Sequence, residues 1–89
     1  WNFPCSIPAG GIFGALMAGN CVLFKPAVET LAIGRLLTEI LWEAGIPKDV
    51  LQFIACRDEP EGSALIKDKR VNTIILTGST DTAKLFLRL

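Results

Sequence analysis

Apolar residues in this chain gather in short uninterrupted runs, which are separated by longer segments of mixed polarity. Three of these runs, residues 21–25, 50–55 and 71–76, have the length and the composition of strands that are buried on both faces. Proline, polar residues or glycine follow each run and end it. The runs therefore predict three short strands, and the segments around them are available for helices and turns.

The first predicted helix covers residues 8–17. This segment is apolar on all sides and rich in glycine and alanine, which is typical of a buried helix that packs closely against a sheet. Ser6 is expected to cap its beginning, and Pro8 suits a first turn because its missing N–H needs no partner there. Gly19, followed by an asparagine, is expected to end the helix.

The second helix is predicted to begin at Glu29 and to end at Gly45, where a proline two residues later reinforces the stop. Its side chains divide into an apolar stripe, expected to face the core, and a polar side, expected to face water. The apolar stripe contains Leu36, Leu37, Ile40 and Leu41, and the polar side contains Arg35, Thr38, Glu39 and Glu43.

Two further helices are expected, one over residues 58–67 and one following Ser79, which would complete a regular alternation of strands and helices. Strands that are separated by helices form parallel sheets with right-handed crossover connections. The predicted fold class is α/β: an open, Rossmann-like but incomplete parallel sheet with helices on both faces, about three strands and about four helices.

The composition is unusually apolar for a small independent domain. Of the 89 residues, 51% are hydrophobic, and a chain of this length buries only about 60–65% of its unfolded surface. The chain also opens on a tryptophan and closes within an apolar helical segment. We expect it to be an internal part of a larger protein, with some apolar surface facing segments outside it.

Charge and residue content exclude several classes of function. The net charge is zero, so no electrostatic footprint for nucleic acid is present. Without histidine, a Ser-His catalytic pair is excluded within the chain. The three cysteines, Cys5, Cys21 and Cys56, match neither a metal-binding nor a disulfide spacing, and no metal site is predicted.

The cysteines also indicate the cellular compartment. Cys21 and Cys56 border predicted strands, and we expect them to be small buried side chains in a reducing compartment, either the cytoplasm or, in a eukaryote, the mitochondrial matrix. The longest apolar stretch, residues 7–24, is interrupted by proline and several glycines. This interruption argues against a membrane-spanning helix.

Ligands of open parallel sheets bind beyond the carboxyl ends of the strands, and this rule selects candidate site residues. Lys25 and Pro26 end the first predicted strand, and Gly78 and Ser79 follow the third. A cation, the free N–H groups of a helix start and a hydroxyl together suit a phosphate-bearing ligand. The Trp1-Asn2 turn would lie at the same edge if a strand preceded residue 1.

Each of these residues also has a simpler interpretation. Lys25 could be a solvated charge at a strand end, and Gly78-Ser79 could be only a tight turn with a capping serine. Asn2 could be a structural turn residue before proline. Neither the GxGxxG fingerprint nor a Walker lysine is present, so the residues alone predict a possible nucleotide site and nothing more specific.

Five linked motifs resemble the aldehyde dehydrogenase superfamily, in its order and at its spacing. They are WNFP at residues 1–4, IPAGGIFGALMAGN at 7–20, VLFKPA at 22–27, EAGIPKDVLQFI at 43–54 and LTGST at 76–80. The resemblance covers essentially the whole chain. It implies that residues 1–89 are a partial NAD(P)-binding domain of an enzyme that normally forms homo-oligomers and oxidises a small-molecule aldehyde.

The resemblance also implies roles for individual residues. Asn2 would donate a hydrogen bond to the oxygen of the thiohemiacetal that forms when a cysteine attacks the aldehyde. The other implied residues bind the cofactor. Trp1 and Phe3 would flank its cleft, Lys25 would reach the adenosine ribose, Pro26 would shape the strand end, and Gly78 and Ser79 would face the pyrophosphate.

The chain departs from the family pattern at two positions. Members that use NAD often have a ribose-binding glutamate three residues after the lysine, where this chain has Val28; Glu29 follows one step later and is counted among the cofactor contacts. The family also often has a second glycine five residues after Gly78, and here that residue is Ala83. NAD or NADP is therefore implied, with a slight preference for NAD.

KPAVE and TGSTDTAKLF, at residues 25–29 and 77–86, resemble the branch that oxidises glutamate semialdehyde, in particular the bifunctional enzymes of proline catabolism. The nucleophilic cysteine and the general-base glutamate of the family lie downstream of this region. The isolated chain is therefore expected to be inactive. The alternative function is a non-catalytic nucleotide-binding or interaction module that derives from the same fold.

Overall fold

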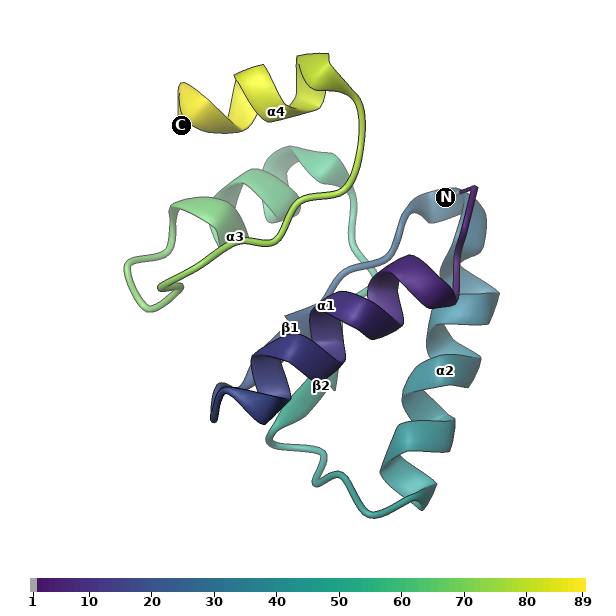
Figure 1. The fold of residues 1–89 in the computed structure, drawn as a ribbon. Helices are drawn as coiled ribbons and strands as arrows, with labels where there is room; N and C mark the ends of the chain where they lie inside the picture. The colour runs from purple at the N-terminus through teal and green to yellow at the C-terminus, as the bar shows by residue number, and fades with distance from the viewer. Residues whose placement is uncertain (1) are drawn as a thin grey trace. The chain divides into compact units, whose positions relative to one another are not determined.

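The structure, a computed structural model, describes residues 2–89 and contains two compact units, Trp1–Ala55 and Cys56–Leu89. Figure 1 shows the elements in chain order. The first unit contains α1 (Ser6–Met17), β1 (Val22–Phe24), the 3₁₀ turn η1 (Val28–Thr30), α2 (Leu31–Glu43) and β2 (Leu51–Phe53). The second contains the π-helical turn η2 (Asp58–Gly62), α3 (Ser63–Lys67) and α4 (Thr80–Leu87).

β1 and β2 pair in parallel, with Val22 opposite Leu51 and Phe24 opposite Phe53. Helix α2 forms the crossover between them, as the alternating pattern predicted (Figure 1). Backbone hydrogen bonds extend the pairing by one residue at each end: Val22 N donates to Val50 O at 2.8 Å, and Ile54 N donates to Phe24 O at 2.8 Å. The α/β class with a parallel sheet is thus confirmed.

The core of the first unit takes one buried side chain from each of its main elements. Ile12 comes from α1, Phe24 from β1, Leu41 from α2 and Leu51 from β2. Leu51 is completely inaccessible to solvent. Phe24 also meets Phe53 edge to face, with ring centroids 6.1 Å apart. Because each element contributes to one cluster, burial of apolar surface holds both helices against the two strands.

Glycines end both long helices, as predicted. Gly19 and Gly45 have φ angles of 85° and 112°, which a residue without Cβ adopts at little cost. After α2, Gly45 N donates to Trp42 O and Ile46 N donates to Leu41 O, both at 3.1 Å. The end of α1 has the same pair of bonds. Each helix therefore closes in a Schellman motif.

The start of α1 differs from the prediction. Ser6 lies inside the helix, and Cys5 occupies the N-cap position without a capping hydrogen bond from its side chain. The helix can begin this early because Pro8 then lies in the first turn, where a backbone N–H has no intrahelical acceptor. Ala9 N accordingly makes an early helical hydrogen bond, to Cys5 O at 2.9 Å.

The predicted third strand at residues 71–76 is wrong. The sheet in the described part of the chain has two strands, and residues 71–76 form neither strand nor helix. Ile74, Ile75 and Leu76 are exposed. A strand cannot satisfy its own backbone groups, so an apolar, β-branched run becomes one only when a neighbouring strand supplies the hydrogen bonds.

The prediction for the faces of α2 is also partly wrong. Thr38, expected to face water, is completely buried, whereas Leu36 and Ile40 are 57% and 53% exposed. The buried residues are Gly34, Thr38 and Leu41, which lie on one face of a helix because they are four and three residues apart. Thr38 tolerates burial because its hydroxyl donates to Gly34 O at 2.8 Å.

In the second unit, three hydrogen bonds hold Asp68 in its ionised form. The backbone N and Nε of Arg70 donate to Oδ1, both at 2.9 Å, and Nη2 donates to Oδ2 at 2.7 Å. This guanidinium, with the backbone N–H, holds the pKa of Asp68 well below its usual range. A lowered pKa means a small stabilisation that is present above the unfolded-state pKa and is lost as the pH falls through the folded-state value.

We therefore expect an NMR titration to place the carboxyl pKa of Asp68 below that of an unstructured aspartate. In the Arg70→Ala variant the pKa should rise most of the way to the ordinary value, since only the backbone N–H at residue 70 remains as a donor. An unchanged Asp68 pKa in that variant would show that the ion pair is not formed in solution.

Candidate functional site

Lys25 and Pro26 lie directly after β1, in the connection that leads to α2. Pro26 is buried and Lys25 is half-buried. The connection is held at both ends, because Ile54 N donates to Phe24 O on one side and Thr30 donates to Ala27 O on the other. The backbone N and the hydroxyl of Thr30 make these last bonds, at 3.0 and 3.3 Å. The connection thus presents Lys25 at the carboxyl end of a strand from an ordered turn.

The same connection carries Glu29. It lies in η1 and is exposed, and Val28 beside it is 61% exposed. Lys25, Pro26 and Glu29 are thus brought together within one turn between β1 and α2, at the sheet edge where open parallel sheets bind ligands.

Asn2 and Phe3 lie at the N-terminal end of the first unit, in the turn that enters α1. Both side chains are exposed, and Phe3 O accepts a hydrogen bond from Ile7 N at 3.4 Å. The third predicted residue of this turn, Trp1, lies outside the described residues. The amide of Asn2 is therefore available to an external acceptor, and the turn itself contacts α1 through the backbone of Phe3.

In the second unit, Ser79 caps α4. Its Oγ accepts from Thr82 N at 3.1 Å and lies 3.0 Å from Thr82 Oγ1. Ser79 is thus a helix cap, and its cofactor role stays a prediction. The first intrahelical bond runs from Ala83 N to Ser79 O, so the N–H groups of residues 80 and 81 precede the helical ladder.

The space around Gly78 is open. A Cβ built on it would come no closer than 4.0 Å to Leu76 and Thr82, and its φ angle lies outside the left-handed region. Neither packing nor backbone conformation therefore demands glycine at this position. Asp81 in the first turn of α4 adds a negative charge near the same end, which favours the helix but opposes an anion.

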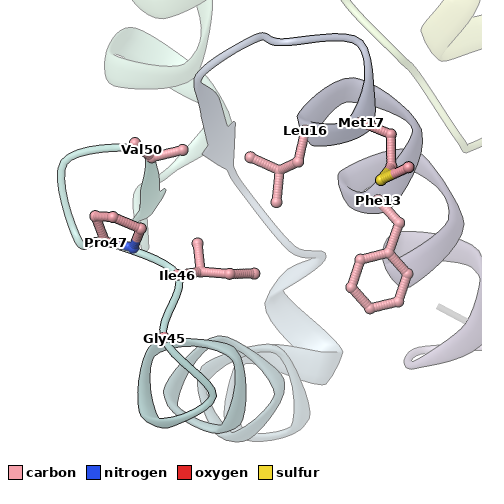
Figure 2. Close-up of a pocket in the computed structure, with 7 residues that line it drawn as sticks. All are labelled: Phe13, Leu16, Met17, Gly45, Ile46, Pro47 and Val50. Carbon is pink, nitrogen blue, oxygen red and sulfur yellow. The ribbon is translucent and has the colours of Figure 1, made fainter.

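Sequence analysis did not anticipate the apolar pocket shown in Figure 2, whose volume is about 340 Å³. Its lining residues are Phe13, Leu16, Met17, Gly45, Ile46, Pro47 and Val50. These residues belong to the segments that lead into β1 and β2, so the pocket is at the amino ends of the strands, away from Lys25. No lining side chain is polar, so the pocket offers no side chain that could bind a phosphate or orient a reacting group.

A cluster of cations and aromatic rings on α2, β2 and the connection between them was also not predicted. Arg35 lies over the rings of Trp42 and Phe53, at 5.1 and 5.6 Å, and Lys48 lies 5.1 Å from Trp42. Trp42 Nε1 donates to Leu51 O at 2.8 Å. The only sequence signal for this cluster is the helical spacing of Arg35 and Trp42, and its contacts fasten α2 to β2.

Within residues 2–89, no group of three cysteine, aspartate or glutamate side chains could hold a metal ion. All three cysteines are unpaired thiols. Cys56 is half-buried, whereas Cys21, expected to be buried, is exposed and precedes β1. No helix in the same part of the chain is long and apolar enough to cross a membrane.

Comparison with known proteins confirms the family resemblance. The sequence profile of the aldehyde dehydrogenase family matches residues 1–88. The bifunctional protein PutA of Klebsiella aerogenes is 48% identical over 88 residues, which cover 99% of the chain and 7% of that protein. A 1-pyrroline-5-carboxylate dehydrogenase of Staphylococcus aureus strain JH1 is 43% identical over 82 residues, 92% of the chain and 16% of the relative.

A third relative is the D-glyceraldehyde dehydrogenase (NADP(+)) of Thermoplasma acidophilum, which is 39% identical over 84 residues, 94% of the chain and 17% of that protein. No solved structure matches the chain. The chain spans only 7% to 17% of the lengths of these three relatives.

Proposed function

The chain belongs to the aldehyde dehydrogenase family, and from this we propose that it is part of the NAD(P)-binding domain of an enzyme that oxidises an aldehyde to a carboxylate. The observation that carries the proposal is the extent of the family match, which covers residues 1–88 rather than a single motif. One relative has both an aldehyde substrate and NADP(+) in its name, which supports the same chemistry here.

Two places in the chain have the chemistry that a dinucleotide requires. Lys25 provides a half-buried cation at the carboxyl end of β1, where we assign it to the adenosine ribose, with Pro26 shaping the turn. Gly78 provides open space before α4, where the N–H groups ahead of the helical ladder would bind the pyrophosphate. Ser79 supports that contact by capping the helix.

When bound, the dinucleotide would accept the hydride that the aldehyde carbon loses. The residues of this chain would position it and stabilise charge. Phe3, with Trp1, would flank the cofactor cleft. Asn2 would donate its amide N–H to the oxyanion that develops when a cysteine thiolate, outside this chain, attacks the carbonyl carbon. Water would then release the carboxylate from the cysteine thioester.

We favour NAD over NADP because of Glu29. Its carboxylate is exposed in η1, four residues after Lys25, and would repel a 2′-phosphate on the adenosine ribose. We favour glutamate γ-semialdehyde as the aldehyde because one relative is named a 1-pyrroline-5-carboxylate dehydrogenase. 1-Pyrroline-5-carboxylate is the cyclised form of glutamate γ-semialdehyde.

The test of the cofactor site is Gly78→Ala in the complete enzyme. A methyl group fits at this position with only ordinary contacts to Leu76 and Thr82, so thermal stability should not fall. It would, however, occupy the space that the pyrophosphate needs. We expect the Kd for NAD to rise by about tenfold or more, equivalent to about 1.4 kcal/mol of binding free energy, measured by calorimetric titration.

Gly14→Ala is the matched control, since a Cβ at Gly14 of α1 meets nothing within 4 Å. It should leave NAD affinity unchanged and should not lower stability, since alanine has the higher helix propensity. Equal NAD affinity in wild type and Gly78→Ala would remove Gly78 from the cofactor site. If the complete enzyme bound NAD(P) but produced no NADH or NADPH with any aldehyde, the alternative, a non-catalytic nucleotide-binding module, would be favoured.

A further inference from the structure

We infer that Gly34 of α2 is a positioning residue for Lys25, and that it therefore sets the affinity for the dinucleotide without taking part in the chemistry. The inference rests on the proposed cofactor role of Lys25. It adds a residue that touches neither cofactor nor substrate and that the sequence analysis did not select.

The starting observation is a very close approach between α2 and the turn after β1. A Cβ built on Gly34 would lie 2.9 Å from both Cβ and Cγ of Pro26 and 3.4 Å from Cε2 of Phe24. Carbon atoms in contact are normally about 3.5–4.0 Å apart. Only glycine permits this approach, and the two atoms that a methyl group would meet first belong to a rigid ring.

The helix cannot easily move away to relieve such a clash. Gly34 shares its face with Thr38 and Leu41, both of which are buried. Thr38 donates to Gly34 O at 2.8 Å, and Leu41 belongs to the core cluster with Leu51. Withdrawal of α2 would open this core, which is costly in a close-packed interior.

Phe24 is equally constrained. It is 92% buried, its carbonyl accepts from Ile54 N at 2.8 Å, and its ring packs against Phe53. The remaining direction of relief is a shift of Pro26 toward solvent. Because Lys25 is bonded directly to Pro26, the lysine must move with it.

A hydrogen bond from Lys25 to a ribose hydroxyl tolerates only a narrow range of distances, about 2.7–3.2 Å. A displacement of the turn by a few tenths of an ångström would therefore weaken this bond. The adenosine end of a dinucleotide is remote from the reacting aldehyde, so the catalytic step itself should change little. The expected signature is a change in cofactor affinity without a matching change in kcat.

The experiment is steady-state kinetics of the Gly34→Ala variant of the complete enzyme. We expect the KM for NAD to rise about threefold to tenfold, equivalent to about 0.65–1.4 kcal/mol. At saturating NAD, kcat and the KM for the aldehyde should stay within twofold of wild type. Gly14→Ala, a helical glycine with nothing within 4 Å of its Cβ position, should change none of these constants.

The Leu41→Ala variant separates a purely structural role of Gly34 from a positioning role. It weakens the same core without adding an atom between α2 and Pro26. If Leu41→Ala lowers the melting temperature as much as Gly34→Ala but leaves the KM for NAD unchanged, the positioning role is supported. If both variants raise the KM for NAD equally, the inference is overturned. Should Gly34→Ala fail to fold, Pro26→Ala disturbs the same contact by removing the ring and should also raise the KM for NAD.

Lys25→Ala distinguishes failure of this inference from failure of the proposed function. If Lys25→Ala weakens NAD binding and Gly34→Ala does not, only the positioning role is wrong. If Lys25→Ala leaves NAD binding unchanged, the cofactor assignment of Lys25 is wrong, and the inference fails with it.

Discussion

Replacing Asn2 with alanine in the complete enzyme is expected to lower kcat by about 10²- to 10³-fold, the effect of removing one oxyanion-hole donor. The variant lacks the amide N–H that would otherwise stabilise the negative charge developing on the carbonyl oxygen. Affinity for NAD should not change, because the amide stabilises charge that is absent from the cofactor complex. Stopped-flow measurement of NADH formation and calorimetric titration of NAD would provide the two quantities.

Asn2→Asp is the informative companion variant. The carboxylate has nearly the shape of the amide but has no N–H to donate, and its charge would repel the developing oxyanion. We expect it to be at least as impaired as Asn2→Ala. If both variants kept wild-type kcat and instead lost thermal stability, Asn2 would be only a turn residue before Pro4.

Replacing Leu51 with alanine is expected to cost about 2–5 kcal/mol of unfolding free energy, the range for truncating a fully buried leucine. Leu51 is completely inaccessible and shares the core with Ile12, Phe24 and Leu41. The total free energy of unfolding of a folded domain is only about 5–15 kcal/mol. The variant should therefore lose a large part of its stability. Urea denaturation of the protein that contains this chain, followed by tryptophan fluorescence, would measure the loss.

Leu23→Ala is the matched control in the neighbouring strand. Leu23 pairs in register with Gln52, the residue after Leu51, and its side chain is 46% exposed. It should cost well under half as much as Leu51→Ala, because less apolar area is removed from water on folding. Equal losses for the two variants would mean that the core is not organised around β2 as described.

The cofactor residues illustrate how far a site can be predicted from sequence. Lys25 and Pro26 were selected because they follow an apolar run, and the structure does place them at the end of β1. Ser79 was given two interpretations, and its hydrogen bond to Thr82 N confirms the cap. No sequence pattern pointed to Gly34, because a glycine inside a helical pattern does not reveal which residue packs closely against it.

Helix α2 shows the same limit for the fold. Its bounds followed from local signals, but its buried face did not. Leu36 and Ile40 are more apolar than Thr38, yet Thr38 is the buried residue. The absence of a side chain at Gly34 lets the helix approach Pro26 and Phe24, and the hydroxyl of Thr38 bonds within its own helix. Shape and internal hydrogen bonding outweighed hydrophobicity here.

The sequence by itself determined the features whose causes lie within a few residues of chain. These are the glycine-terminated helices at Gly19 and Gly45 and the serine cap at Ser79. Motifs spread along the whole chain also determined its membership of the aldehyde dehydrogenase family. Tertiary structure alone decided which face of α2 is buried and that residues 71–76 are not a strand. Both depend on a partner distant in the chain: a helix face needs a surface that fits it, and a strand needs a neighbour to satisfy its backbone.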